Sequence, residues 1–172
     1  MINFIDITYL RTGSQRQKKA YKVLTAHSIL TKLANYTPIL TGTIPINIDI
    51  ENSDLDIICY FKNKEEFRNQ LTKLFQNNMG FVISESPTFN SVKANFFIDD
   101  FEIEVFGQNI PTQGQNAYRH MLIEYTILAE KGEAFRQQVI DLKKQGIKTE
   151  PAFAQLLGLE GNAYEELLKL EF

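Results

Sequence analysis

Tryptophan is absent from this 172-residue chain, cysteine occurs once, and the longest apolar runs are short. The single Cys59 cannot form an internal disulfide, which excludes a disulfide scaffold and suits a reducing compartment. No window approaches the roughly 20 apolar residues of a membrane-spanning helix, and the N-terminus lacks the pattern of a signal peptide. We therefore expect a cytoplasmic protein that does not enter a membrane.

Net charge is also small, since 18 Lys and Arg stand against 21 Asp and Glu. A protein that binds duplex nucleic acid by neutralising phosphates is normally more basic, so this composition does not favour nucleic acid as a partner, without excluding it. The apolar fraction of 44% is ordinary for a globular protein and is enough to fill a core. Disorder is excluded, and the length fits one domain or one domain with a helical appendage.

Periodicity and turn residues predict an α+β chain. Ser14 and Gln17 form a capping-box pattern that opens the first helix, and 44–50 is predicted to be a loop or edge strand because it contains a proline. The predicted helices are 14–35, 63–78, 115–130, 133–144, 151–157 and 163–170, and the predicted strands are 38–41, 55–61, 81–84, 88–98 and 100–106, the last two joined at Asp99-Asp100. We expect a mixed sheet flanked by helices in residues 1–110, with a helical region, 111–172, packed on it.

Charge is unevenly distributed along the chain. Residues 1–35 carry six Lys or Arg and one acid, whereas residues 36–61 carry four acids and no Lys or Arg. In a strand, Asp54 and Asp56 project from the same face, with Cα atoms roughly 7 Å apart. Two such carboxylates repel each other unless a proton or a cation lies between them, and Mg²⁺ is the natural occupant. The alternative is a solvated pair of acids on an exposed face.

Two further features favour the functional interpretation. Gly42-Thr43 ends the preceding strand, and a glycine turn lets backbone N–H groups approach a phosphate. The segment Phe101–Phe106 alternates, with Glu102 and Glu104 on one face. Acids from two strands beside a glycine turn form the template of two-metal phosphoryl chemistry. The four phenylalanines at 96, 97, 101 and 106 are expected in the core.

At these residues the chain resembles the nucleotidyltransferase superfamily, which includes DNA polymerase beta and the antibiotic nucleotidyltransferases. The matching signature is a Gly-Ser-like turn at Gly42-Thr43, then Asp54-Leu55-Asp56, then a third acid on a neighbouring strand. More narrowly, TGTIPINIDIENSDLDIICYF, IEVFGQ and QNAYRHMLIEY look like an uncharacterised bacterial family assigned to that superfamily.

The resemblance implies a nucleotidyltransferase-like fold and Mg²⁺- or Mn²⁺-dependent transfer of a nucleotidyl group from a nucleoside triphosphate to an unknown acceptor hydroxyl. Asp54 and Asp56 would bind both metal ions, and Glu104, chosen over Glu102, would complete the catalytic set. Gly42 and Thr43 would contact the triphosphate, and Ser53 would also bind the nucleotide. A catalytically inactive nucleotide-binding or regulatory module of the same fold and a metal-dependent phosphoesterase are the alternatives.

The sequence departs from the superfamily pattern because residues 44–53 contain no Arg. Phosphate contacts would then come from Lys62, Lys93 or the Arg16-Lys18-Lys19 cluster, although a solvated helix face is the simpler interpretation of that cluster. His120 and Glu124 lie four residues apart on a predicted helix. They form a structural pair or, if the helix covers the Asp pair, His120 contacts substrate or takes part in proton transfer. Arg119 and Glu102 are further possible substrate contacts.

Overall fold

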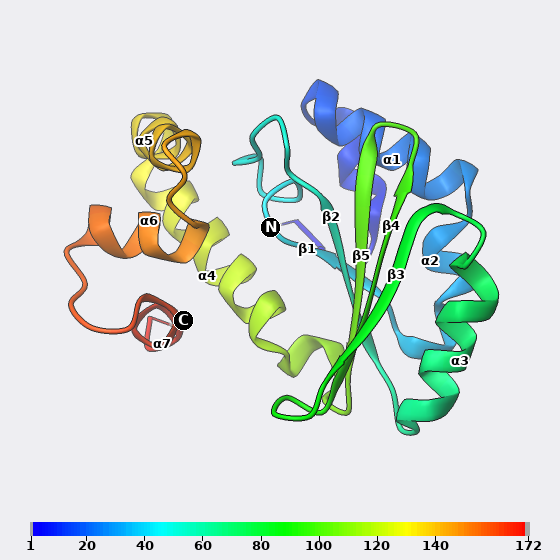
Figure 1. Cartoon of the computed structure of the whole chain (residues 1–172). Helices are drawn as coiled ribbons and strands as arrows, with labels where there is room; N and C mark the ends of the chain where they lie inside the picture. The colour runs from blue at the N-terminus through cyan, green and yellow to red at the C-terminus, as the bar shows by residue number, and fades with distance from the viewer. Residues whose placement is uncertain (1, 171–172) are drawn as a thin grey trace.

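One mixed five-stranded sheet organises the protein, whose computed structural model describes residues 2–170 (Figure 1). The strands are β1 (Ile39–Thr41), β2 (Leu55–Tyr60), β3 (Met79–Ser86), β4 (Ser91–Ile98) and β5 (Phe101–Gln108), in the spatial order β1-β2-β5-β4-β3. β2 and β5 pair in parallel, and every other neighbouring pair is antiparallel. The predicted α+β class is confirmed.

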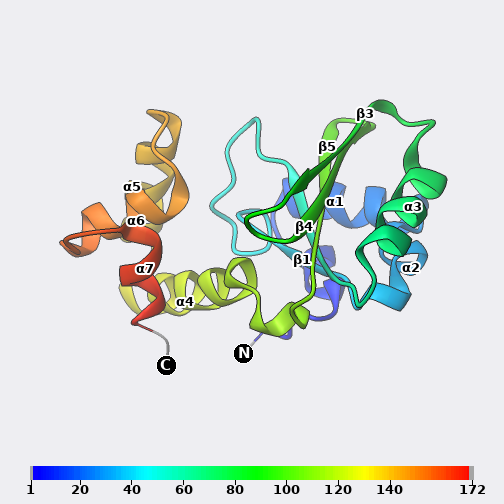
Figure 2. The same ribbon diagram turned by 60° about the horizontal axis from the view of Figure 1, so that its bottom comes forward.

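Helices lie on both sides of this sheet. One group consists of α1 (Gln15–Ala26), α2 (Ile29–Lys32) and α3 (Lys64–Phe75). A second group follows β5 and consists of α4 (Asn116–Lys131), α5 (Glu133–Lys144), α6 (Thr149–Leu157) and α7 (Ala163–Leu168). Figure 2 shows α4 leading away from the sheet to α5, α6 and α7. Short 3₁₀ turns occur at Ile7–Thr12, Ala34–Tyr36 and Thr112–Gly114.

Local sequence explains most element ends. The Ser14–Gln17 capping box is formed, and Asp99 turns the β4–β5 hairpin with a φ of 50°. The predicted single helix over 14–35 is wrong, because Ser28 adopts a left-handed conformation with a φ of 53° and separates α1 from α2. The third strand is longer than predicted, because its pairing with β4 extends it from Met79 to Ser86.

Two apolar clusters stabilise the chain. One fills the space between the sheet and the first helices. The other lies among α4–α7 and also receives Phe4, Ile46 and Ile48, which are buried. Ile46 and Ile48 belong to the loop between β1 and β2, and burying each side chain contributes about 2 kcal/mol. The helical region is therefore joined to the sheet through this loop as well as through the chain after β5; the division at residue 110 stays a prediction.

The phenylalanines do not all lie in the core. Phe96 and Phe101 are buried, but Phe97 is 41% exposed and Phe106 is half-buried. Side chains alternate between the two faces of a strand, and both residues lie on the face that carries the acids. Phe97 is the register partner of Glu102, and Phe106 lies two residues after Glu104 on β5. The prediction of a core position is wrong for these two residues. In the part of the chain that the structure describes, no helix combines the length and the apolar character needed to span a membrane.

Candidate active site

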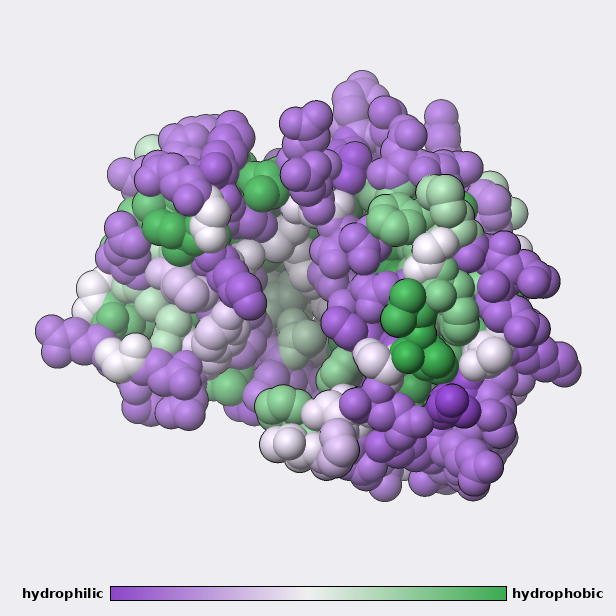
Figure 3. All heavy atoms as spheres, in the orientation of Figure 1, coloured by the Kyte–Doolittle hydropathy of each residue, from purple (hydrophilic) through white to green (hydrophobic). Residues whose placement is uncertain are grey.

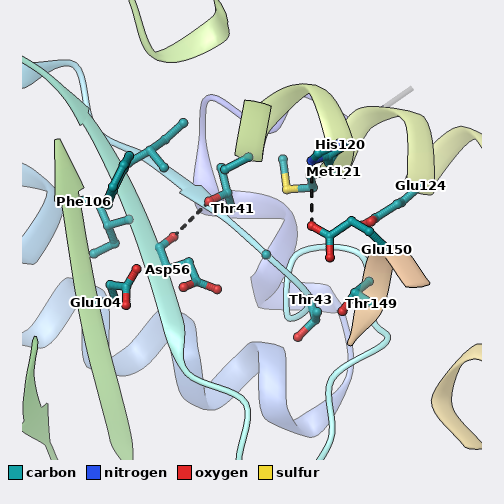
Figure 4. Close-up of a pocket in the computed structure, with 14 residues that line it drawn as sticks. Thr41, Thr43, Asp56, Glu104, Phe106, His120, Met121, Glu124, Thr149 and Glu150 are labelled. Carbon is teal, nitrogen blue, oxygen red and sulfur yellow. Dashed lines mark hydrogen bonds and ion pairs between the residues drawn. The ribbon is translucent and has the colours of Figure 1, made fainter. Parts of the chain in front are cut away.

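The acids predicted from the sequence meet on neighbouring strands. Asp56 is the register partner of Glu104 on β5 and of Thr41 on β1, while its chain neighbours Leu55 and Ile57 are buried on the opposite face. Asp54 directly precedes β2 and is half-buried. Glu104 is half-buried and lies close to Asp56 in Figure 4, whereas Glu102 is exposed. This placement supports Glu104 over Glu102 as the third acid.

Burial and mutual repulsion act on these carboxyls in the same direction. Burial, then the charges of Asp54 and Glu104, raises the pKa of Asp56 from its ordinary 3.8 to about 8. Burial is also the main cause that raises the pKa of Asp54, with Glu104 and Glu102 adding to it. Such a site favours either protons or a cation beside Asp54 and Asp56.

A lysine already occupies part of the surroundings of Glu104. Lys93 Nζ lies 3.1 Å from Glu104 Oε2, and Asn95 Nδ2 donates to the same oxygen at 3.4 Å. Within residues 2–170, no three His, Cys, Asp or Glu side chains lie close enough together to hold a metal ion. The donor chemistry nevertheless fits a hard divalent cation, because Asp54 and Asp56 supply only oxygen atoms and are not ion-paired in the described chain. Glu104 would become a third ligand once its ion pair with Lys93 is broken.

The turn directly after β1 requires glycine. Gly42 has a φ of +81°, and a Cβ atom added there would overlap the Asp56 carboxylate. The backbone therefore approaches the acid more closely than any other residue would permit. Next to it, the Thr43 hydroxyl donates to Ser53 Oγ at 3.3 Å, and Ser53 Oγ also accepts from the Ile50 N–H at 2.9 Å. Thr43 and Ser53, from opposite ends of the β1–β2 loop, are thus hydrogen-bonded to each other next to Gly42.

Three side chains hold the β1–β2 loop from outside. Arg16 Nη2 donates to the carbonyls of Ser53 at 2.9 Å and Glu51 at 3.3 Å, and its guanidinium lies 4.2 Å from the Phe101 ring centroid. Gln17 Nε2 donates to the Ile44 and Pro45 carbonyls, and Arg136 Nη1 donates to the Ile46 carbonyl at 2.6 Å. Arg16 is therefore occupied as a loop clamp, and the suggestion that it contacts phosphate loses its basis.

Two adjoining cavities open at these acids, in the hollow between the sheet and the C-terminal helices (Figure 3). The first, of about 360 Å³, lies between β1, β2 and β5 on one side and α4 and α6 on the other; the second, of about 520 Å³, extends toward the end of α5. Both are lined by Thr43, Asp56, Thr149 and Glu150. Asp56 therefore lies where the two cavities join.

Lys143 on α5 lines the second cavity, and the sequence interpretation missed it. It is 7% exposed, and desolvation lowers its pKa to about 8, against the opposing charges of Glu124, Asp49, Glu150 and Asp56. A sequence signal for it exists: Lys143 falls four residues after Val139, which is buried on the core-facing side of α5. A lysine at such a position is a candidate functional cation. Lys62, Lys93, Lys18 and Lys19 line neither cavity.

The residues singled out on α4 have different partners from those predicted. His120 Nε2 donates to the Tyr164 carbonyl at 2.8 Å, and His120 Nδ1 lies 3.7 Å from Glu150 Oε1 (Figure 4). The predicted structural pair with Glu124 is therefore wrong. His120 and Glu124 do line the first cavity, as does Phe106. Arg119 contacts Asn116 and lines neither described cavity, so its role as a substrate contact stays a prediction.

Comparison with known proteins places the chain in a family. The profile described as "Domain of unknown function (DUF4269)" matches residues 22–170. The chain belongs to this family. No curated protein matches it.

Solved structures similar to this DUF4269 protein include terminal uridylyl transferases. Cid1, described by its RNA terminal uridylyl transferase activity, superposes with a TM-score of 0.57 at 12% identity over 76% of this chain and 41% of its own. GLD-2 in its complex with RNP-8 gives a TM-score of 0.57 at 14% identity over 88% of this chain and 61% of its own. The chain thus spans less than two thirds of these proteins. At such identities the comparison shows a nucleotidyltransferase-like fold.

Proposed function

We propose that this protein is a divalent-cation-dependent nucleotidyltransferase that transfers a nucleotidyl group from a nucleoside triphosphate to an acceptor hydroxyl. One observation carries the proposal: Asp56, half-buried, paired in register with Glu104 and directly against Gly42, lies where a cavity lined by Lys143 joins one whose described lining has no Lys or Arg. Partly buried acids that repel each other are costly unless a proton or a cation lies between them, and a site that retains two of them against a glycine turn suits a bound cation. The fold shared with Cid1 and GLD-2 supports the reaction class.

The difference in charge between the cavities suggests how a nucleotide lies. The second cavity contains Lys143 and Lys148, together with the hydroxyls of Thr43 and Ser53, and these groups suit phosphate oxygens. The first cavity has no Lys or Arg among its described lining residues and is walled by Ile58, Phe106 and Met121. A triphosphate fits the second cavity, and the nucleoside attached to it fits the first. The α-phosphate then lies beside Asp56.

Each residue has a defined task in this arrangement. Asp54 and Asp56 would hold the cation, which when bound supplies charge neutralisation to the reacting phosphate. Glu104 lies at the sheet side of Asp56, where its carboxylate accepts the proton of an incoming hydroxyl once it leaves Lys93. Lys143 stabilises the negative charge of the departing pyrophosphate, and the apolar wall of the first cavity limits access of water.

The test is nucleotide binding and turnover by the full chain. Mg²⁺ with a nucleoside triphosphate should raise the melting temperature of the wild type, since a ligand bound only by the native state stabilises it. The Asp54→Asn, Asp56→Asn double variant should lose this response. Asp100→Asn, an exposed acid at the β4–β5 turn, is the matched control and should keep it. A wild type that does not respond to Mg²⁺ and nucleotide contradicts the proposal.

The Lys93–Glu104 ion pair favours one competing function, a nucleotide-binding module without catalysis, because it occupies the third acid. Such a module would bind nucleotide through Asp56 and release no pyrophosphate with any acceptor tried. Pyrophosphate release that disappears in Asp56→Asn would exclude it. Release of inorganic phosphate or of a nucleoside monophosphate would instead indicate a phosphoesterase.

A further inference from the structure

The first cavity is short of hydrogen-bond donors. Its described lining contains no Lys, Arg, Asn, Gln or Trp side chain. The polar side chains that line it are three threonines, one histidine and the acids Asp56, Glu104, Glu124 and Glu150. His120 already donates through Nε2 to the Tyr164 carbonyl. A ligand that enters this cavity therefore meets many acceptors and few N–H groups.

Glu124 is the second observation that points to a ligand. Its side chain is 4% exposed, and its Oε1 atom has no hydrogen-bond partner within residues 2–170. It comes from α4, lines the cavity, and lies next to Glu150 in Figure 4. A buried polar atom without a partner costs stability, so its retention calls for an explanation. A ligand that donates a hydrogen bond provides one.

We propose that the first cavity binds an adenine ring and that Glu124, with Glu150, selects it. This inference rests on the proposed function and specifies its nucleotide. Adenine is the common base without a carbonyl oxygen, so its only acceptors are ring nitrogens and it brings no carbonyl group into a cavity that is short of donors. Its exocyclic amino group donates two hydrogen bonds, for which Glu124 and Glu150 provide acceptors. Uracil, cytosine and guanine each carry at least one carbonyl oxygen that would lose its hydrogen bond to water.

The surroundings of Glu124 are consistent with this assignment. Burial raises its pKa well above the ordinary value, Glu150 acts in the same direction, and Lys143 opposes both. A neutral carboxyl group both accepts and donates, so it matches an amino group beside an unprotonated ring nitrogen. The side chains of Ile58, Phe106 and Met121 provide apolar contact for the faces of the ring.

The experiment measures binding to the full chain by calorimetry, with Mg²⁺ and non-hydrolysable analogues of ATP, GTP, CTP and UTP. The wild type should bind the ATP analogue at least about ten-fold more tightly than the other three, which corresponds to about 1.4 kcal/mol. Glu124→Met should lose most of this preference, although it should melt at a higher temperature because it removes an unpaired buried carboxyl. Glu124→Gln keeps one donor and one acceptor and should retain the preference. Glu130→Met, at the exposed end of the same helix, is the control and should change neither property.

The outcomes separate this inference from the proposed function. Equal affinity for the four analogues, tighter binding of another base, or an unchanged preference in Glu124→Met would overturn the adenine assignment and leave the nucleotidyltransferase proposal in place. Binding of none of the four would overturn both. Inorganic tripolyphosphate is a further probe: Lys143→Met should weaken its binding, and Glu124→Met should not.

Discussion

Asp56→Asn should make the metal-free protein more stable while it removes the response to Mg²⁺. The pKa of Asp56 is raised from 3.8 to about 8, so the folded state holds this proton more tightly than the unfolded chain does. The free energy of unfolding that Asp56 supplies is therefore fully present below about pH 4 and is lost as pH rises through about 8. At 1.36 kcal/mol per pKa unit, the whole interval corresponds to an upper bound of about 5–6 kcal/mol.

The measured effect should be smaller, because an ionised Asp56 can turn toward solvent in the adjoining cavities. We expect Asn to raise the free energy of unfolding by about 2–3 kcal/mol at about pH 8, which is about 5–10 °C in melting temperature for a chain of this size. The gain should become small at about pH 4 and vanish below it, where the wild-type carboxyl is protonated in the folded state and also becomes protonated in the unfolded chain.

The assay is thermal unfolding in a chelator and in Mg²⁺, across this pH range. In the chelator the variant should melt above the wild type at about pH 8, and added Mg²⁺ should reverse the order. An Asn variant that is no more stable than the wild type at any pH would show that Asp56 is not strained by burial. Equal stabilisation of both proteins by Mg²⁺ would show that it is not a ligand.

Three further substitutions test the surroundings of the acids. Gly42→Ala should lower the free energy of unfolding by about 1–3 kcal/mol in a urea titration, because alanine disfavours the positive φ and its Cβ atom would overlap Asp56. An unchanged free energy of unfolding would mean that the turn can relax. Arg16→Met should leave the Ser53 carbonyl without its donor and weaken the Mg²⁺-dependent shift in melting temperature. Lys19→Met is the exposed control. An unchanged shift in Arg16→Met would show that the loop keeps its conformation without this hydrogen bond. Lys93→Met should strengthen Mg²⁺ binding in calorimetry by freeing Glu104, at a stability change of less than about 1 kcal/mol; weaker binding would assign Lys93 itself to the site.

Local pattern predicted the strands that carry the acids. The alternation in 101–106 and the spacing of Asp54 and Asp56 express the two-residue period of a strand, and this period holds whatever packs on the sheet. The same period applied to 96–106 would have placed Phe97 and Phe106 beside the acids. Apolar character alone suggested a core position for them, although the face of the sheet that carries the acids borders a cavity instead of a packed core.

Other features required the tertiary structure. Glu150 and Lys143 reach the acids from α6 and α5, about 90 residues later in the chain, and no local spacing reveals such an approach. The function of Arg16 also depends on long-range contacts, since its partners Glu51 and Ser53 are backbone carbonyls in another segment. The apolar pattern of a helix continues past Ser28, so helical periodicity did not indicate the turn there.

The loop that follows Gly42 has a mechanical consequence. Ile46 and Ile48 are buried among the C-terminal helices, and Arg136 of α5 donates a hydrogen bond to the Ile46 carbonyl. The glycine turn is consequently tethered to both halves of the molecule. Only a few peptide units separate Gly42 from Ile46, so a rearrangement of α4–α7 would displace Gly42. Because Gly42 lies against Asp56, a change in the packing of these helices would alter the position of the Asp56 carboxylate.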